Sequence, residues 1–143
     1  MDLSVDLYIT ELHLHKMIKY ATLAIPNECC GFLGGSAGRV QKVYPVTNTA
    51  NSPVRYHMDA TEQVRSMIAI HRAGWEILGI FHSHPCGPPI PSETDLRKAN
   101  YQDAAYVILC PGLKGAWQAR SFRINKRQWF EVTIHSEKFG DNL

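Results

Sequence analysis

Apolar positions along this chain follow two spacings, one helical and one typical of strands. Where they recur every three or four residues near the N-terminus they predict a helix, which Thr10 is suited to cap and Pro26 to end. Its apolar face consists of Leu14, Met17, Ile18, Ala21 and Ile25. A second helix should follow the capping-box-like residues 59–62 and end at Gly74. Its apolar face is expected to consist of Val64, Met67, Ile68 and His71.

Continuous apolar runs bounded by glycine or proline predict buried strands. We expect four such strands, at residues 30–33, 40–46, 77–81 and 105–109. The first two should form a hairpin whose turn runs from Gly34 to Gly38. A short helix from Ser92 to about Tyr101 should lie between the last two, and residues 117–124 and 129–134 should add two antiparallel strands. Residues 47–58 read as a polar loop with a short extended piece around Tyr56. This order of elements predicts an α/β sandwich built on one mixed β-sheet.

Composition supports a single globular domain over residues 1–143, with 45% hydrophobic and 20% charged residues. The net charge of +2 is too small to favour nucleic acid as a partner. No apolar run approaches the roughly 20 residues that a membrane span requires. The acidic N-terminus lacks the apolar core of a signal peptide, which predicts a cytoplasmic protein with reduced cysteines. The basic residues Arg120, Arg123, Lys126 and Arg127 are expected on a solvated strand face.

Candidate chemistry is concentrated at the end of the strand 77–81. His82 and His84 alternate there and should point to the same face, and a loop rich in proline and glycine then leads to Ser92 and Asp95. Two imidazoles and one carboxylate form a typical protein ligand set for catalytic zinc, with water in the fourth position. The spacing therefore predicts a Zn²⁺ site held by His82, His84 and Asp95.

The complete pattern, H-x-H followed by seven residues and S-x-x-D, resembles the JAMM motif of the MPN-plus metalloproteases. The segment from Asn27 to Gly35 is similar to the family's upstream element, in which Glu28 is the acidic residue. The resemblance covers most of the chain and implies the MPN fold, a mixed β-sheet flanked by helices. It also implies that Glu28 is the general base that returns a proton to the leaving amine, and that Ser92 stabilises the oxyanion.

Each of these residues also has an ordinary structural interpretation. Ser92 and Asp95 fit a helix capping box, which is compatible with ligation because the cap would pre-organise Asp95. Cys86 is either a simple loop thiol, which we favour, or an additional soft ligand. A second H-x-H pair, His13 and His15, lies on a predicted helix, where residues two apart face different ways.

The resemblance implies a zinc-dependent metallopeptidase or isopeptidase that cleaves after the C-terminal Gly-Gly of a ubiquitin-like protein. Because the chain is short and lacks long insertions, we expect a prokaryotic-type enzyme acting on small sulfur-carrier proteins. A non-catalytic MPN scaffold is the first alternative, although such modules typically lack ligands. A zinc nucleoside deaminase is a weaker alternative, because the second cysteine of its P-C-x-x-C segment is absent after Pro85-Cys86. The oligomeric state is left open.

Overall fold

The computed structural model describes residues 6–138, so the first and last five residues of the expected 1–143 domain, including most of the acidic N-terminus, lie outside it. The helices are α1 (Glu11–Ala24), α2 (Ala60–Arg72) and α3 (Glu93–Lys98), with a short 3₁₀ turn at Leu113–Gly115. The strands are β1 (Leu7–Thr10), β2 (Cys30–Ser36), β3 (Arg39–Val46), β4 (Glu76–Ser83), β5 (Ala105–Pro111), β6 (Trp117–Asn125), β7 (Gln128–Val132) and β8 (Ile134–Glu137).

Within the described residues these strands form one mixed sheet in the order β7-β6-β5-β4-β2-β3-β1-β8. The strand β4 lies near its centre, antiparallel to β2 and parallel to β5. The strands β7 and β8 occupy opposite ends of this order, yet Thr133 alone separates them in the chain. Since consecutive Cα atoms lie about 3.8 Å apart, the two ends of the sheet must meet, and the sheet is strongly curled.

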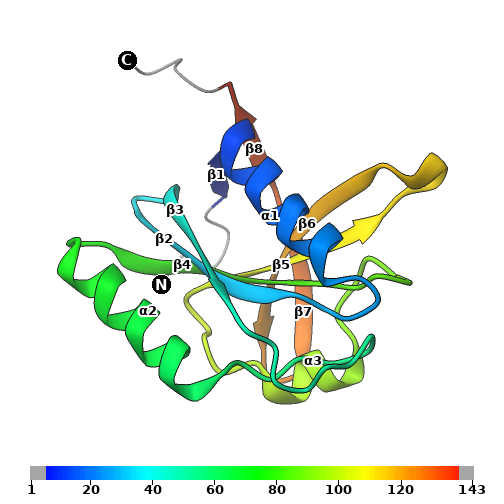
Figure 1. Cartoon of the computed structure of the whole chain (residues 1–143). Helices are drawn as coiled ribbons and strands as arrows, with labels where there is room; N and C mark the ends of the chain where they lie inside the picture. The colour runs from blue at the N-terminus through cyan, green and yellow to red at the C-terminus, as the bar shows by residue number, and fades with distance from the viewer. Residues whose placement is uncertain (1–5, 139–143) are drawn as a thin grey trace.

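Each face of the sheet has its own hydrophobic core, because neighbouring residues of a strand point to opposite faces. Met17 and Ala21 of α1 pack on the face that carries Phe81. Ile70 of α2 and Leu96 of α3 pack on the face that carries Ile80. Figure 1 shows α1 above and α2 below the strands β2 and β4. These layers confirm the predicted mixed sheet flanked by helices.

The main differences from the sequence prediction lie in the N- and C-terminal strands, the first hairpin and the third helix. The expected strand 129–134 is two strands. The regular strand is interrupted at Thr133, and Ile134 then pairs with Leu7 of β1. The strand β1 itself was not predicted. Gly34 and Gly35 belong to β2, where a bulge lets the strand continue to Ser36, so the turn is limited to residues 37 and 38. The helix α3 ends at Lys98 rather than near Tyr101.

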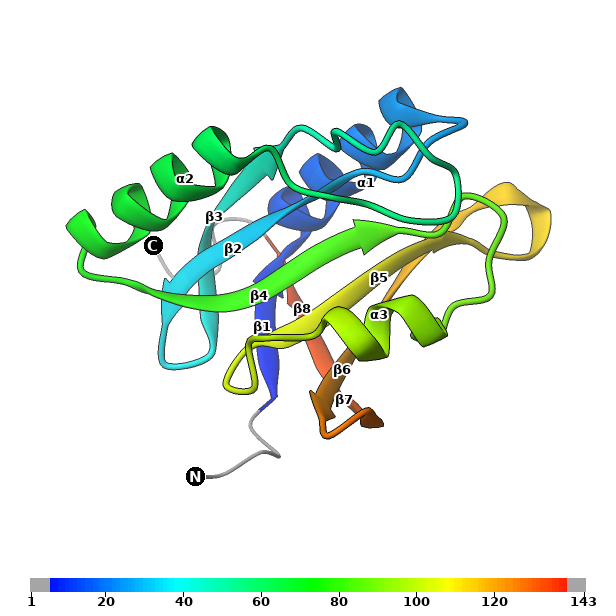
Figure 2. The ribbon, with the colours of Figure 1, turned by 90° about the horizontal axis from the view of Figure 1, so that it is seen from below.

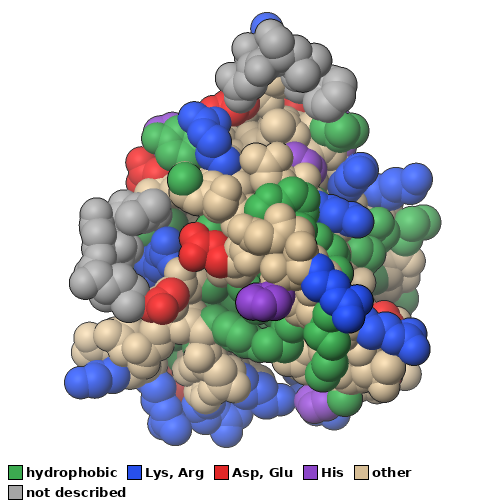
Figure 3. All heavy atoms as spheres, turned by 90° about the vertical axis from the view of Figure 1, so that its left-hand side faces the viewer, with side chains coloured by type: hydrophobic (Ala, Val, Ile, Leu, Met, Phe, Trp, Pro, Cys, Tyr) green, Lys and Arg blue, Asp and Glu red, His purple; other side chains and the backbone are tan. Residues whose placement is uncertain are grey.

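The predicted apolar faces of the helices are correct only in part. In α1 the face is as expected except for Ile25, which follows the helix and is exposed. In α2 the expected apolar residues Val64, Met67 and Ile68 are exposed instead of packing on the sheet. The sheet is contacted instead by Ile70, beside half-buried polar residues of the same helix. Figure 3 shows hydrophobic side chains exposed around a histidine on the side where α2 and the β2–β3 hairpin lie.

The basic residues near the C-terminus do not share one solvated face as expected. Arg123 is buried, and its guanidinium donates to the carbonyl oxygen of Asp103 at 2.6 Å. Arg120 forms a two-pronged ion pair with Glu131 across the β6–β7 hairpin. Lys126 and Arg127 form the turn of that hairpin, both with positive φ. Where each of these basic side chains lies depends on its polar partner or on the turn of the hairpin. The spacing of charges along the sequence does not predict either.

Candidate active site

The two histidines of the motif lie at the C-terminal end of β4 on the α2 and α3 face of the sheet. His82 shares its face with Ile80, and both histidines are almost completely buried. The backbone N–H of His84 donates to the carbonyl oxygen of Leu109 and extends the pairing with β5. The Nδ1–H of His84 donates to the carbonyl oxygen of Pro88 at 2.8 Å. A carbonyl can only accept, so the neutral ring presents the lone pair of Nε2 to the site.

Asp95 reaches the same point from the first turn of α3. The Ser92 hydroxyl accepts from the backbone N–H of Asp95 at 3.0 Å, and the Asp95 carboxylate accepts from the backbone N–H of Ser92 at 2.9 Å. This complete capping box fixes the carboxylate relative to the helix. Because Ser92 Oγ is used as an acceptor, its own O–H is free to donate toward the site. Figure 2 shows the loop after β4 returning to α3 beside β5, which brings the two parts of the motif together.

Three potential ligand atoms converge at the centre of this site. The Nε2 atoms of His82 and His84 are 3.0 Å apart, and each lies 3.1 Å from Oδ2 of Asp95. Neighbouring ligands of a tetrahedral zinc ion with bonds of 2.0–2.1 Å are about 3.3 Å apart, so the spacing fits. Lone pairs of His84 and Asp95 point at this centre, and a single proton on His82 cannot satisfy both. The donor set is therefore suited to a divalent cation with nitrogen and oxygen ligands.

Glu28 is a fourth member of the site and lies just before β2. Its carboxylate lies within 4.8 Å of ring nitrogens of both His82 and His84, and these three residues form a group that can hold a metal ion. Glu28 is 3% exposed, and its Oε1 has no hydrogen-bond partner within the described residues. A buried carboxylate oxygen without a partner is costly, which is typical of a functional position.

The ionisation of the site follows from burial and from the pairing of its charges. Burial raises the pKa of Glu28 to about 8; the charge of His84 opposes this and that of Asp95 adds to it. Burial also acts to raise the pKa of Asp95, but His82, His84 and the Ser92 N–H outweigh it and hold that pKa well below its usual range. Burial acts to lower the pKa of His84, but hydrogen bonds to Asp95 and Pro88 raise it overall. Within one site, the pKa of the Glu28 carboxyl group is therefore raised and that of Asp95 is lowered.

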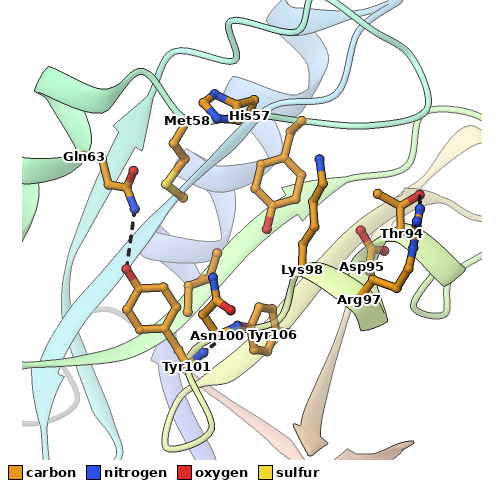
Figure 4. A pocket seen from close by; sticks show the side chains of 12 residues that line it. His57, Met58, Gln63, Thr94, Asp95, Arg97, Lys98, Asn100, Tyr101 and Tyr106 are labelled. Atoms are coloured by element: carbon orange, nitrogen blue, oxygen red, sulfur yellow. Dashed lines mark hydrogen bonds between the residues drawn. The ribbon is translucent and has the colours of Figure 1, made fainter. Parts of the chain in front are cut away.

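A groove of about 480 Å³ opens beside Asp95, between α3, the start of α2 and the segment that precedes α2. Tyr101 forms part of its lining, and its hydroxyl accepts from the Gln63 side chain at 3.5 Å. Figure 4 shows Asp95 at one end of the groove and Lys98 extending from α3 toward the segment that carries His57 and Met58. An extended peptide chain can reach the site along such a groove.

His13, His15 and His135 lie outside the group of converging side chains, and so does the exposed Cys86. His13 is engaged by Thr10 and by the carbonyl oxygen of Gln41, and His15 is exposed, as expected for a helical pair. His135 is paired with Asp6 and stacked on Tyr8. Cys86 is exposed and absent from the metal-binding group found among residues 6–138, which favours the loop thiol.

Three residues that support the site were not singled out by the sequence. The ring of Tyr56 packs against that of His82, with centroids 4.8 Å apart. Ser83, fully buried on the opposite face, accepts from the backbone N–H of Cys29 at 2.8 Å and holds β4 beside Glu28. Asn48 bonds to the carbonyl oxygen of Glu28. Strand alternation indicates only that Ser83 points to the face opposite to His82 and His84. It is the one sequence signal that bears on any of these three residues.

The amino-acid sequence matches the family model of prokaryotic homologues of the JAB domain over residues 10–125. It is 39% identical to a desampylase of Pyrococcus furiosus, a match that covers 82% of this chain and 83% of that protein. It is 34% identical to the CysO-cysteine peptidase of Mycobacterium tuberculosis, covering 78% and 77%.

Solved structures give the same picture of the fold. The solution structure of a protein from Desulfitobacterium hafniense superposes with a TM-score of 0.83 at 33% identity and covers 95% of this chain and 96% of that one. The crystal structure of a JAB1/MPN domain protein of Archaeoglobus fulgidus gives a TM-score of 0.58 at 20% identity, covering 92% and 99%. The second likeness concerns the fold alone, and it agrees with the MPN architecture expected from the motif.

Proposed function

Because the chain belongs to the family of prokaryotic homologues of the JAB domain, we propose that it is a zinc-dependent peptidase of JAMM type. It hydrolyses the amide bond that follows the C-terminal Gly-Gly of a ubiquitin-like or sulfur-carrier protein. The observation that carries this proposal is the convergence of His82, His84 and Asp95 at 3.0–3.1 Å beside the buried carboxylate of Glu28. The names of the relatives, a desampylase and a CysO-cysteine peptidase, support the substrate class.

In this proposal His82, His84 and Asp95 would hold the zinc ion. A zinc ion held there would polarise the substrate carbonyl and lower the pKa of a bound water to about 7. Glu28 accepts the proton that the attacking water loses as its oxygen bonds to the carbonyl carbon. Burial raises the pKa of Glu28 to about 8, and a neighbouring divalent cation would lower it into a range suited to proton transfer.

Collapse of the tetrahedral species completes the reaction. The C–N bond breaks, and Glu28 returns its proton to the leaving nitrogen. The Ser92 hydroxyl, anchored by the backbone N–H of Asp95, donates a hydrogen bond to the oxyanion as it forms. Substrate selection is assigned to the groove beside Asp95, where a tail without bulky side chains can lie close to the protein.

The test is cleavage of a ubiquitin-like protein fused through Gly-Gly to a reporter peptide, with and without a chelator. Wild-type protein with zinc should cleave at that bond. The Glu28→Gln variant should bind zinc equally well but cleave about 10²–10⁴-fold more slowly. Wild-type protein that binds zinc and leaves every such fusion intact would favour the alternative of a non-catalytic MPN scaffold.

We also propose that the enzyme acts in the cytoplasm. All four cysteines are free, including the exposed Cys86, which fits a reducing compartment. No helix within residues 6–138 is both long enough and apolar enough to cross a membrane. The small net charge of +2 favours a protein substrate over nucleic acid.

A further inference from the structure

The segment between β3 and α2, residues 47–58, forms one wall of the site. Figure 2 shows it passing the C-terminal end of β4. Tyr56 in this segment packs its ring on His82, at 31° between the ring planes. The Nδ1 atom of His82 is buried and has no hydrogen-bond partner within the described residues. A ligating histidine is normally oriented through that nitrogen, so here the orientation of the ring depends on packing against Tyr56.

The segment is held in place by the side chain of Asn48, which makes four hydrogen bonds to the backbone. Its amide nitrogen donates to the carbonyl oxygens of Glu28 at 3.0 Å and Arg55 at 3.2 Å. Its amide oxygen accepts from the backbone N–H groups of Ala50 at 3.0 Å and His57 at 2.9 Å. Two acceptors face one end of the amide and two donors face the other, so the orientation of the amide is determined.

These partners flank the functional groups of the site. Arg55 and His57 are the two neighbours of Tyr56, so Asn48 fixes the backbone on both sides of the ring that covers His82. The same amide nitrogen also holds the carbonyl of Glu28. We propose that Asn48 is a positioning residue that sets Glu28 and Tyr56 relative to the ligands His82 and His84.

This inference rests on the proposed function for its effect on catalysis, although its structural consequence can be measured without any substrate. Asn48 does not contact the reacting atoms in this scheme. It acts through the placement of the general base and of one ligand, and a misplacement of about 1 Å can reduce a rate about 10²-fold. Other bonds, such as that from Thr49 N–H to the carbonyl of His57, do not involve the Asn48 side chain, so the segment should stay in place when that side chain is altered.

The test variant is Asn48→Asp, which keeps the size of the side chain but places a carboxylate oxygen against the carbonyl oxygens of Glu28 and Arg55. The matched control is Asn51→Asp, which adds the same charge three residues away. Asn51 is exposed, its side chain makes no hydrogen bond within the described residues, and its positive φ is one that aspartate tolerates. Asn48→Ala serves as a second test, because it removes all four bonds without burying a charge.

Zinc-loaded variants are compared for kcat and KM below their unfolding temperatures, and cobalt(II)-substituted variants for their visible absorption, which reports ligand geometry. Both Asn48 variants should lose about 10²-fold in kcat with little change in KM. Their cobalt spectra should shift from the wild-type spectrum, whereas that of Asn51→Asp should not. Tyr56→Leu should reproduce the spectral shift and Tyr56→Phe, which keeps the ring, should not.

A merely structural role for Asn48 would lower the unfolding temperature and leave kcat and the cobalt spectrum of the folded variants unchanged. That result would overturn the inference. The proposed function fails separately, if zinc-loaded wild-type protein cleaves no Gly-Gly fusion. In that case the cobalt spectra still decide whether Asn48 positions the ligands.

Discussion

Replacing Glu28 by glutamine should stabilise the zinc-free protein, and by more as the pH rises. In the wild-type protein Glu28 is 3% exposed, and its Oε1 lacks a partner within the described residues. Burial raises its pKa from the ordinary 4.5 to about 8. Glutamine has nearly the same shape and carries no charge at any pH, so it removes the cost of burying an ionised group.

The sign and size of this difference in the free energy of unfolding follow from proton linkage. Below about pH 4.5 Glu28 is protonated in both the folded and the unfolded chain, and ionisation costs nothing. Between 4.5 and about 8 the unfolded chain ionises while the folded protein keeps its proton, so stability falls by about 1.4 kcal/mol per pH unit. The full window sets a ceiling of about 5 kcal/mol. Because Glu28 lines a small pocket that water can enter, we expect about 2–3 kcal/mol at pH 8.

The assay is urea denaturation of zinc-free wild-type and Glu28→Gln protein at several pH values. Other titrating groups are common to both proteins and cancel in the difference between them. Glu28 also raises the pKa of Cys29, Cys30 and Tyr56, but these groups titrate above this pH range. The pKa of His84 is raised partly by Glu28 as well, and its contribution to the difference has the same sign. The control is Glu76→Gln, which makes the same substitution at an exposed position at the opposite end of β4. The reasoning is refuted if the gain from Glu28→Gln is constant with pH, or if wild type is the more stable protein at pH 8.

Further predictions concern the metal, the fold and the substrate. Asp95→Ala should abolish zinc binding by elemental analysis, because it leaves only two of the three converging ligand atoms; retained equimolar zinc would contradict the ligand set. Cys86→Ser should keep zinc content and kcat/KM near wild type, and loss of zinc would instead make Cys86 a ligand. Gly31→Ala should cost at least about 3 kcal/mol in urea, since a Cβ there would collide with the Tyr44 carbonyl and the Phe81 ring; unchanged stability would exclude this close approach. Replacing the Gly-Gly of a fusion by Leu-Leu should sharply reduce kcat/KM, and equal cleavage would leave an unspecialised peptidase.

The sequence by itself was sufficient to predict the elements that carry the proposed ligands and to propose the ligand pattern. A continuous apolar run predicts β4 because a central strand is buried on both faces, and strand alternation then places His82 and His84 on one side. The capping box of Ser92 and Asp95 is a local interaction within one helical turn. Local rules decide such features, so spacing alone predicts them.

Contacts between distant segments were decided by the tertiary structure alone. The strand β8 pairs with β1 across 127 positions of the chain (Leu7 with Ile134), and this pairing splits the expected strand 129–134. The tertiary structure also leaves the apolar face of α2 exposed. The opposite side of that helix borders the groove and contacts the sheet through Ile70. Periodicity reports which residues of a helix share a face, but not which face the rest of the protein covers.

The same division applies to the site. The sequence contained His82, His84, Asp95, Glu28 and Ser92 as a pattern, and the fold brought Glu28, 54 positions before His82, to within 4.8 Å of the histidine nitrogens. No spacing rule pointed to Tyr56 or Asn48, since their roles arise from a ring contact and from backbone groups of a loop without regular structure. The physical reason is that the type of a residue decides which atoms it can offer to a metal, and the sequence states that type directly. The orientation and burial of those atoms arise only when distant segments pack together.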